Sequence, residues 1–192
     1  MTKPPVETKL MNKALDYLGR YNTSEHRLRE VLRRFALRRL YKHNPDKIAK
    51  VISATVTRCQ KLGYLDDDAF AKSQARSHRL QGRSKIGIRQ RLRQHRLDDN
   101  IIDVALDAAD QHTKNSELLA ACLFARRRRL GPFDRREYED TNDRETNIRR
   151  QLGSLARAGF NRAISYTVIE LENMHAAEIL IDQLEKGEDI KI

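Results

Sequence analysis

The chain has 192 residues, 34% of them charged, with a formal net charge of +11 and a pI near 9.9. It has no apolar run long enough for a transmembrane helix and no signal-peptide pattern, so we expect a cytoplasmic protein without membrane contact. A cationic excess of this size attracts polyanions, and nucleic acid, or an assembly containing it, is the first partner to consider. Arginine is also a good helix former on solvated faces, which explains the number of arginines but not their excess over acids.

Three amphipathic helices are predicted before residue 64. Ser24 is a favourable N-cap for the second helix, Pro45 suits the first turn of the third, and Gly63 ends it. The apolar residues follow the three-and-four spacing that buries one helix face. They are Leu10, Ala14, Tyr17, Leu18 and Tyr21 in the first helix, Leu28, Val31, Leu32 and Phe35 in the second, and Ile48, Val51, Ile52, Val56, Cys59 and Leu62 in the third.

The stretch LGYLDDDAFAKS, residues 62–73, joins this trio to the next helix. Gly63 allows the left-handed backbone that ends a helix, and acidic side chains in a first turn satisfy free amides and oppose the helix dipole. We therefore predict that Asp66, Asp67 and Asp68 are capping residues. A calcium loop is the alternative, but it needs alternating ligands, a mid-loop glycine and a distal glutamate.

The helical pattern then recurs. A helix is predicted from about Asp67 to Leu80, a second after Ser84 and a third after Asp98. The two second helices match at a displacement of 60 positions, which pairs Ser24, Leu28, Arg29, Leu32 and Arg33 with Ser84, Ile88, Arg89, Leu92 and Arg93.

A third copy is looser. Its first helix stops at Gly131, its second ends at Gly159, and Asn161 caps its third. Ile148 and Arg149 repeat Ile88 and Arg89 at displacement 60, whereas Leu155 matches Leu92 only at displacement 63. Two registers therefore remain open.

The predicted fold is all-α, with three tandem three-helix repeats in an elongated, curved array, because a unit of about sixty residues buries too little surface alone and leans on its neighbours. We expect the final GEDIKI to be frayed. The predicted segments are a flexible lead (1–8), repeats at 9–64, 65–112 and 113–173, a polar loop (132–144) inside the third repeat, and a C-terminal extension (174–192).

The sequence carries no catalytic, cofactor-binding or metal-binding motif. A phosphate-binding glycine loop, a nucleophile elbow and HExxH are all missing, and the six histidines are scattered. Cys59 and Cys122 stand alone in helical patterns, so we predict buried thiols without a disulfide or metal. The chain is therefore predicted to be a binding protein rather than an enzyme, with no cofactor.

The arginines are better organised. Arg29 and Arg33 project from the same flank of their helix as Arg89 and Arg93 do from theirs, so stacked repeats would align them along a phosphate backbone or an acidic protein rim. The open alternative is a solvated flank on which acids such as Glu25 compensate the charge. A second basic patch spans a full helical turn, so at least one stem should meet the core. It consists of Arg126, Arg127, Arg128 and Arg129.

Two competing interpretations remain. The helix after Ser84 carries Arg89, Gln90, Arg93 and Gln94, as would the recognition helix of a helix-turn-helix regulator of transcription that binds duplex DNA. A sequence-blind nucleic-acid binder is the other alternative, and it would show only steep salt dependence.

Several segments resemble the bacterial RecX regulatory proteins, over roughly residues 10–171. They are ALDYLGRYNTSEHRLREVL, LGYLDDDAFAKSQARS, IRQRL, IIDVAL, RRRRLGPF and LARAGF. The sequence departs from the usual pattern at Leu97, where the second repeat often has glycine-isoleucine, and in the polar loop before Ile148.

The resemblance implies three tandem three-helix repeats without catalytic residues, in a monomer that acts in DNA repair, homologous recombination and the SOS response. It also implies binding to the RecA filament on single-stranded DNA, with direct DNA contact, and inhibition of the ATPase, strand-exchange and coprotease activities of RecA. The candidate contact residues for this filament are Arg29, Arg33, Arg89, Arg93, Arg126, Arg127, Arg128, Arg129 and Arg149.

Overall fold

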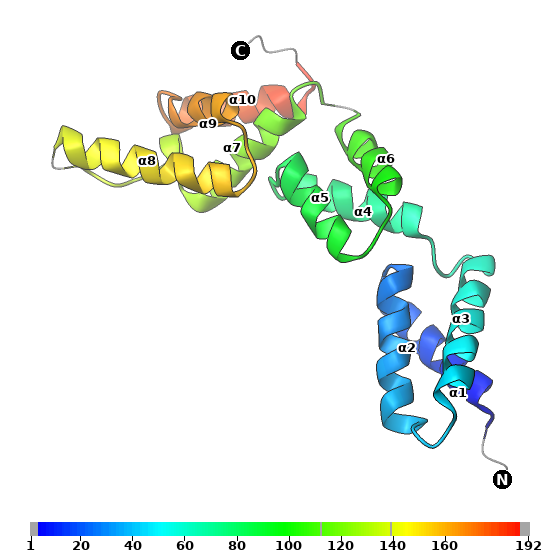
Figure 1. Ribbon diagram of the computed structural model, residues 1–192. Coiled ribbons are helices and arrows are strands. Elements are labelled where there is room, and N and C mark those ends of the chain that lie inside the picture. Colours follow the sequence, from blue (N-terminus) through cyan, green and yellow to red (C-terminus); the bar gives the residue numbers. More distant parts are fainter. Residues whose placement is uncertain (1–3, 112, 139, 189–192) are drawn as a thin grey trace. The chain divides into compact units, whose positions relative to one another are not determined.

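The computed structural model describes residues 4–111, 113–138 and 140–188, and every regular element in them is a helix (Figure 1). Among these helices, none combines the length and the apolar character that crossing a bilayer requires. The helices are α1 (Val6–Leu18), α2 (Glu25–Arg39), α3 (Pro45–Lys61), α4 (Asp67–Leu80), α5 (Lys85–Gln94), α6 (Asp99–Asp110), α7 (Ser116–Arg128), α8 (Thr141–Arg157), α9 (Arg162–Ile169) and α10 (Met174–Glu185), with a short 3-10 helix, η1 (Gly131–Phe133), after α7.

The chain divides into two compact units. Unit 1 comprises Met1–Ala71 and Arg93–Ile101, and unit 2 comprises Lys72–Leu92 and Ile102–Ile192. The division falls inside the predicted second repeat, since α4, α5 and α6 each contribute to both units.

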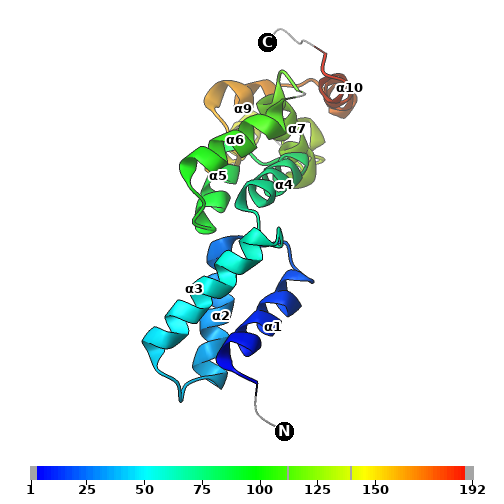
Figure 2. The same ribbon diagram turned by 90° about the vertical axis from the view of Figure 1, so that its right-hand side faces the viewer.

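In unit 1, α1, α2 and α3 pack against one another (Figures 1 and 2). The start of α2 is fixed by Ser24, whose hydroxyl accepts a hydrogen bond from the Arg27 amide, and the start of α3 by Asn44, which caps it ahead of Pro45. The predicted cap Ser24 and the predicted first-turn proline Pro45 are thus present, whereas the cap Asn44 was not predicted. The core of the trio consists of Val6, Leu10, Ala14, Leu28, Leu32, Ala36, Leu40, Ile48, Ile52, Val56, Cys59 and Leu65.

Three details differ from the sequence prediction. Helix α1 begins at Val6, inside the predicted flexible lead 1–8, because the Val6 side chain is in the core and only 8% exposed. Residues 1–3 of that lead lie outside the described residues. Tyr21 and Leu62, both assigned to buried stripes, are 53% exposed, because each lies beyond the end of its helix.

The junction at residues 62–73 caps two helices rather than one. Gly63 has φ of +72°, and Asp66 accepts a hydrogen bond from the Ala69 amide at 2.9 Å, as capping predicts. Asp67 instead accepts from the Glu25 amide at 2.8 Å, so it satisfies the first turn of α2. Burial raises the pKa of this Asp67 carboxyl. Asp67 of α4 therefore caps the N-terminus of α2 by accepting from an amide 42 residues earlier in the sequence.

The same contact between an acid and the first amide of another helix occurs a second time, in unit 2. Glu117, in the first turn of α7, accepts from the Lys85 amide at the start of α5, as Asp67 does from Glu25 in unit 1. The N-cap serines also behave alike. In unit 1 Ser24 donates its hydroxyl proton to the His95 carbonyl, and in unit 2 Ser84 donates to the Ala158 carbonyl. We call these two contacts the serine joints.

The serine joints decide the register of the third copy. His95 and Ala158, which receive the two serine hydroxyls, are 63 positions apart, as are Leu92 and Leu155, both fully buried. The C-terminal half of α8 therefore follows displacement 63, and Arg149 is not the counterpart of Arg89. The buried residues of α8 are Asn147, Gln151 and Leu155.

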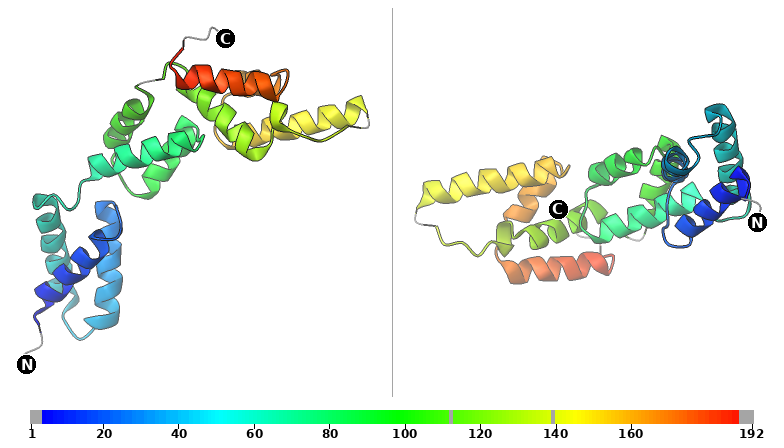
Figure 3. Two further views of the ribbon diagram at one scale, coloured as in Figure 1. Left: turned by 180° about the vertical axis from the view of Figure 1, so that it is seen from behind. Right: turned by 90° about the horizontal axis from the view of Figure 1, so that it is seen from below.

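In unit 2, α7 packs against α9 and α10, and α8 packs against α9. Figure 3 shows α10 running beside α7. The predicted C-terminal extension 174–192 is thus a packed helix over Met174–Glu185, whose Ala177, Ile181 and Leu184 belong to the core. Residues 189–192, at the end predicted to fray, lie outside the described residues.

Both cysteines are fully buried and unpaired, which confirms the predicted buried thiols. Burial raises the pKa of the Cys59 thiol, and that of Cys122 to about 12. We expect that an aromatic disulfide reagent at pH 8 labels neither thiol in the native protein and both in concentrated urea, because only the thiolate reacts. Release of the chromophore by the native protein within minutes would contradict this burial, and a Cys59→Ser variant would identify the reacting thiol.

Candidate protein-binding groove

Helix α2 presents three distinct faces. Leu28, Leu32 and Ala36 point into the core of unit 1. Each step along the helix turns by about 100°. Arg29 and Arg33, which follow the core residues Leu28 and Leu32, therefore lie on one flank of the helix. Arg27, which precedes Leu28, lies on the other flank. Each flank borders a groove.

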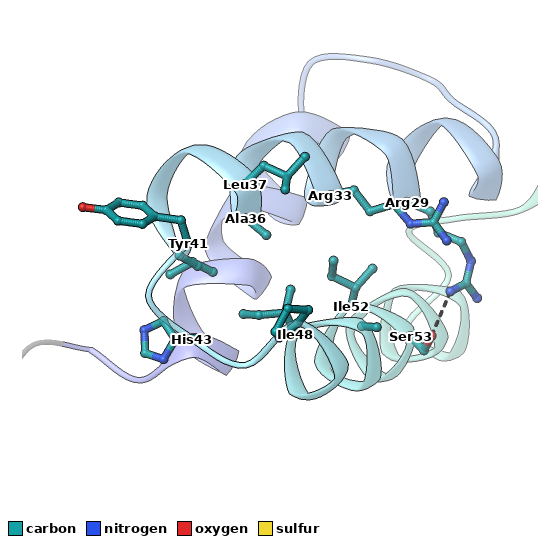
Figure 4. Close-up of a pocket in the computed structure, with 12 residues that line it drawn as sticks. Arg29, Arg33, Ala36, Leu37, Tyr41, His43, Ile48, Ile52 and Ser53 are labelled. Carbon is teal, nitrogen blue, oxygen red and sulfur yellow. Dashed lines mark hydrogen bonds between the residues drawn. The ribbon is translucent and has the colours of Figure 1, made fainter.

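The first groove lies between α2 and α3, has a volume of about 420 Å3 and is mainly apolar. Figure 4 shows Leu37 and Ile52 on facing helices, with Tyr41 at one end. Leu37 is 75% exposed and Tyr41 is 70% exposed, which is high for large apolar side chains four residues apart. The lining residues are Arg29, Arg33, Ala36, Leu37, Leu40, Tyr41, His43, Pro45, Ile48, Ala49, Ile52 and Ser53.

The end of the groove away from Tyr41 carries the two predicted arginines of α2 (Figure 4). Arg29 donates to Glu25 at 2.6 Å and to the Ser53 hydroxyl at 3.1 Å, so it is held in place and partly neutralised. Arg33 is exposed and forms no ion pair with any described residue. The groove therefore has an apolar middle and a cationic end, and it can bind an apolar side chain followed by a carboxylate.

The second groove, between α1 and α2, has a volume of roughly 470 Å3, and five of its eight lining residues are basic. Arg27 and Arg34 pair with Glu30, and the hydrogen bond that Arg27 donates to Glu30 raises the pKa of Arg27. Sequence reasoning missed this groove, although Arg27, Val31, Arg34 and Arg38 recur at helical spacing. Its lining residues are Lys13, Tyr17, Arg27, Val31, Arg34, Phe35, Arg38 and Arg39.

The predicted arginines of α5 are tied to acids of α6. Arg89 pairs with Asp103, and Arg93 pairs with Asp99 at 2.9 Å. A recognition helix needs its arginines free to reach base edges, so these pairs count against the helix-turn-helix interpretation. Arg149 lines neither groove; it lies exposed on α8 of unit 2 and pairs with Glu145 at 3.3 Å.

All four residues of the basic run Arg126–Arg129 are exposed, and the guanidinium carbon of Arg127 lies 5.8 Å from the centre of the Phe124 ring, which packs against the core. Helix α7 ends at Arg128, and Arg129 takes a left-handed backbone with φ of 55°. The buried neighbours on either side of the run are Ala125 and Leu130. Arg126 pairs with Glu178 of α10, and Arg127 donates to the Gln81 carbonyl.

A polar network around Asp134 was also missed. Asn147 and Gln151, buried on α8, both donate to Asp134, and so does the Tyr138 hydroxyl. Burial opposes ionisation of Asp134, but the hydrogen bonds from Tyr138, Arg136 and Asn147 lower its pKa overall. The network fastens residues 134–138 of the predicted polar loop to α8.

Comparison with known proteins agrees with this architecture. Residues 66–106 match the family model described as RecX, second three-helix domain, which covers most of α4, α5 and α6. The chain is 37% identical over 165 residues to regulatory protein RecX of Myxococcus xanthus, which covers 85% of each chain. It is 29% identical over 171 residues to regulatory protein RecX of Agrobacterium fabrum, which covers 89% of this chain and 87% of that one.

The fold is also similar to a solved structure, the crystal structure of RecX from Lactobacillus salivarius. The TM-score is 0.60 at 21% sequence identity, over 86% of this chain and 95% of that one. The identity to the Myxococcus xanthus protein over most of both chains, and the repeated three-helix architecture, lead to one conclusion. The chain belongs to the RecX family of regulatory proteins.

Proposed function

We propose that this protein binds the filament that RecA forms on single-stranded DNA and inhibits its ATPase, strand-exchange and coprotease activities. Membership of the RecX family supports this regulatory role, and the net charge of +11 favours association with an assembly that contains nucleic acid. The protein acts by binding, without cofactor or chemical step.

The apolar groove between α2 and α3 is the main support for a protein partner. A nucleic-acid strand has no aliphatic side chain to fill an apolar groove, whereas a protein surface has both large apolar residues and carboxylates. Exposed Leu37 and Tyr41 would be covered by the apolar residue of the partner, and Arg33 would face its carboxylate. We therefore assign this groove to RecA and not to the DNA.

The test compares two double variants that remove one positive charge and one large exposed side chain each. Arg33→Glu with Leu37→Ser disrupts the groove, while Lys50→Glu with Tyr64→Ser makes the matched change on unit 1 outside the grooves. The groove variant should need a concentration about tenfold higher to halve the ATPase rate of RecA on single-stranded DNA, since a central contact contributes more than 1 kcal/mol.

The control variant should inhibit like the unmodified protein. Circular dichroism and urea unfolding of both variants establish that they are folded. Equal inhibition by a folded groove variant and by the control would refute the groove as the RecA contact. A preference of the unmodified protein for bare single strands or for one duplex sequence over RecA-coated strands would refute the filament proposal itself.

A further inference from the structure

Two arginines of unit 2 that are distant in sequence, Arg83 and Arg127, meet at one turn, and the charge of a third, Arg91, acts on Arg83. Arg83 is in the turn between α4 and α5, Arg91 is on α5, and Arg127 is near the end of α7. Arg127 donates to the Gln81 carbonyl at 2.7 Å, which ties α7 to this turn. The backbone carbonyl of Arg83 accepts from Arg79, which fixes the other side of the turn. We call Arg83, Arg91 and Arg127 the arginine cluster.

The cluster is not neutralised by the protein. None of its three members forms an ion pair with a described residue, although most other arginines discussed above do. The Nε atom of Arg83 is buried and has no hydrogen-bond partner among the described residues. Burial lowers the pKa of Arg83, and the positive charges of Arg91 and Arg127 lower it further. The fold thus holds three guanidinium groups together at a cost in repulsion and desolvation.

We infer that the arginine cluster binds the phosphodiester backbone of a nucleic-acid strand. A chain of phosphates supplies one negative charge per nucleotide along a line, which matches several guanidinium forks held on one surface. A single protein carboxylate neutralises only one member of the cluster, whereas successive phosphates can pair with all three. The site does not require RecA, and it is distinct from the groove between α2 and α3.

The test measures binding of the full chain to fluorescently labelled oligonucleotides by anisotropy at a series of salt concentrations, without RecA. One arm uses single-stranded oligothymidylate and the other a duplex of the same length. The test variant is Arg83→Met with Arg91→Met, which keeps the apolar stems. Arg127 is left unchanged because its bond to Gln81 supports the fold. The control is Arg76→Met with Arg150→Met, two exposed arginines of unit 2 outside the cluster.

In the single-strand arm, loss of two phosphate contacts should reduce the slope of log affinity against log salt by about 1.4, with about tenfold weaker binding at moderate salt. Arg83→Lys with Arg91→Lys should restore the slope, because the charges return. A reduced slope in either arm, with the control unchanged, supports the site and identifies the strand form it prefers.

Two results would overturn the inference. If the control loses as much slope as the test variant, net charge alone drives binding. If the test variant binds oligonucleotides normally but no longer inhibits RecA, the cluster contacts protein carboxylates instead. Because RecA is absent from the oligonucleotide assay, failure of the groove experiment leaves this test unaffected.

Discussion

Replacing Arg79 with methionine should lower the free energy of unfolding of the protein by about 4 kcal/mol. The Arg79 side chain donates to both carboxylate oxygens of Asp110, at 2.7 and 2.8 Å, and to Glu117 at 2.6 Å. The residue is only 8% exposed. Methionine keeps the apolar stem but leaves two acids without their shared cation. It also removes the donor to the Arg83 carbonyl.

The matched control for this change is Arg76→Met, one turn earlier on α4 and exposed. Its effect should stay within about 0.5 kcal/mol, as for most surface substitutions. Urea unfolding followed by circular dichroism measures both variants. Equal midpoints for Arg79→Met and the unmodified protein would show that the pair of acids is satisfied without Arg79.

The substitution Gly82→Ala should destabilise the protein by about 3 kcal/mol, because it combines an unfavourable backbone with a steric clash. Gly82 has φ of +69°, in the left-handed region. A Cβ atom there would lie 2.6 Å from the Phe124 backbone nitrogen and 2.9 Å from the Ala120 carbonyl oxygen. Both are backbone atoms of α7, so the clash is relieved only by moving the helix.

The substitution Gly63→Ala separates the cost of the left-handed backbone from the cost of the steric clash. The φ of Gly63, +72°, is nearly the same, but a Cβ atom there would have no neighbour within 4 Å. Gly63→Ala should therefore cost only the left-handed strain, about 1 kcal/mol. The difference between the two unfolding free energies measures the close approach of α7 to the turn after α4. If both substitutions cost the same, that contact is looser than described.

Local signals in the sequence predicted the helices well. Ser24 and Asn161 are N-caps as expected, and Asp66 closes the start of α4. These signals succeed because a capping side chain and the amide that it satisfies lie within three residues of each other. The repeat of 60 positions also holds at the two N-cap serines, Ser24 and Ser84.

Contacts between helices could not be predicted in the same way. Arg79 follows Ala71 and Ala75 on the buried stripe of α4, and a charged residue on such a stripe does indicate a buried partner. Its acids, Asp110 and Glu117, are 31 and 38 residues away, and no local pattern connects them. The pairing of Arg89 with Asp103, 14 residues away, was unpredicted for the same reason.

Only the basic part of the groove between α2 and α3 could be predicted from the sequence. The helical wheel assigned Arg29 and Arg33 to one flank of α2, and the structure has both on the rim of the same groove. The apolar part was not predicted, because it depends on how α3 lies against α2. Leu37 and Tyr41 are large apolar residues outside the predicted buried stripes, and both are exposed. Such residues are the sequence signal that would have indicated an apolar binding surface.

The serine joints bear on how a protein of this kind could change length. Each joint needs only a hydroxyl at the start of one helix and a carbonyl at the end of another, and every helix already ends in carbonyls without partners. A gene duplication that copied one three-helix repeat would also copy the serine and the helix end that form such a joint. Lineages could therefore gain or lose a trio without evolving a new interface each time.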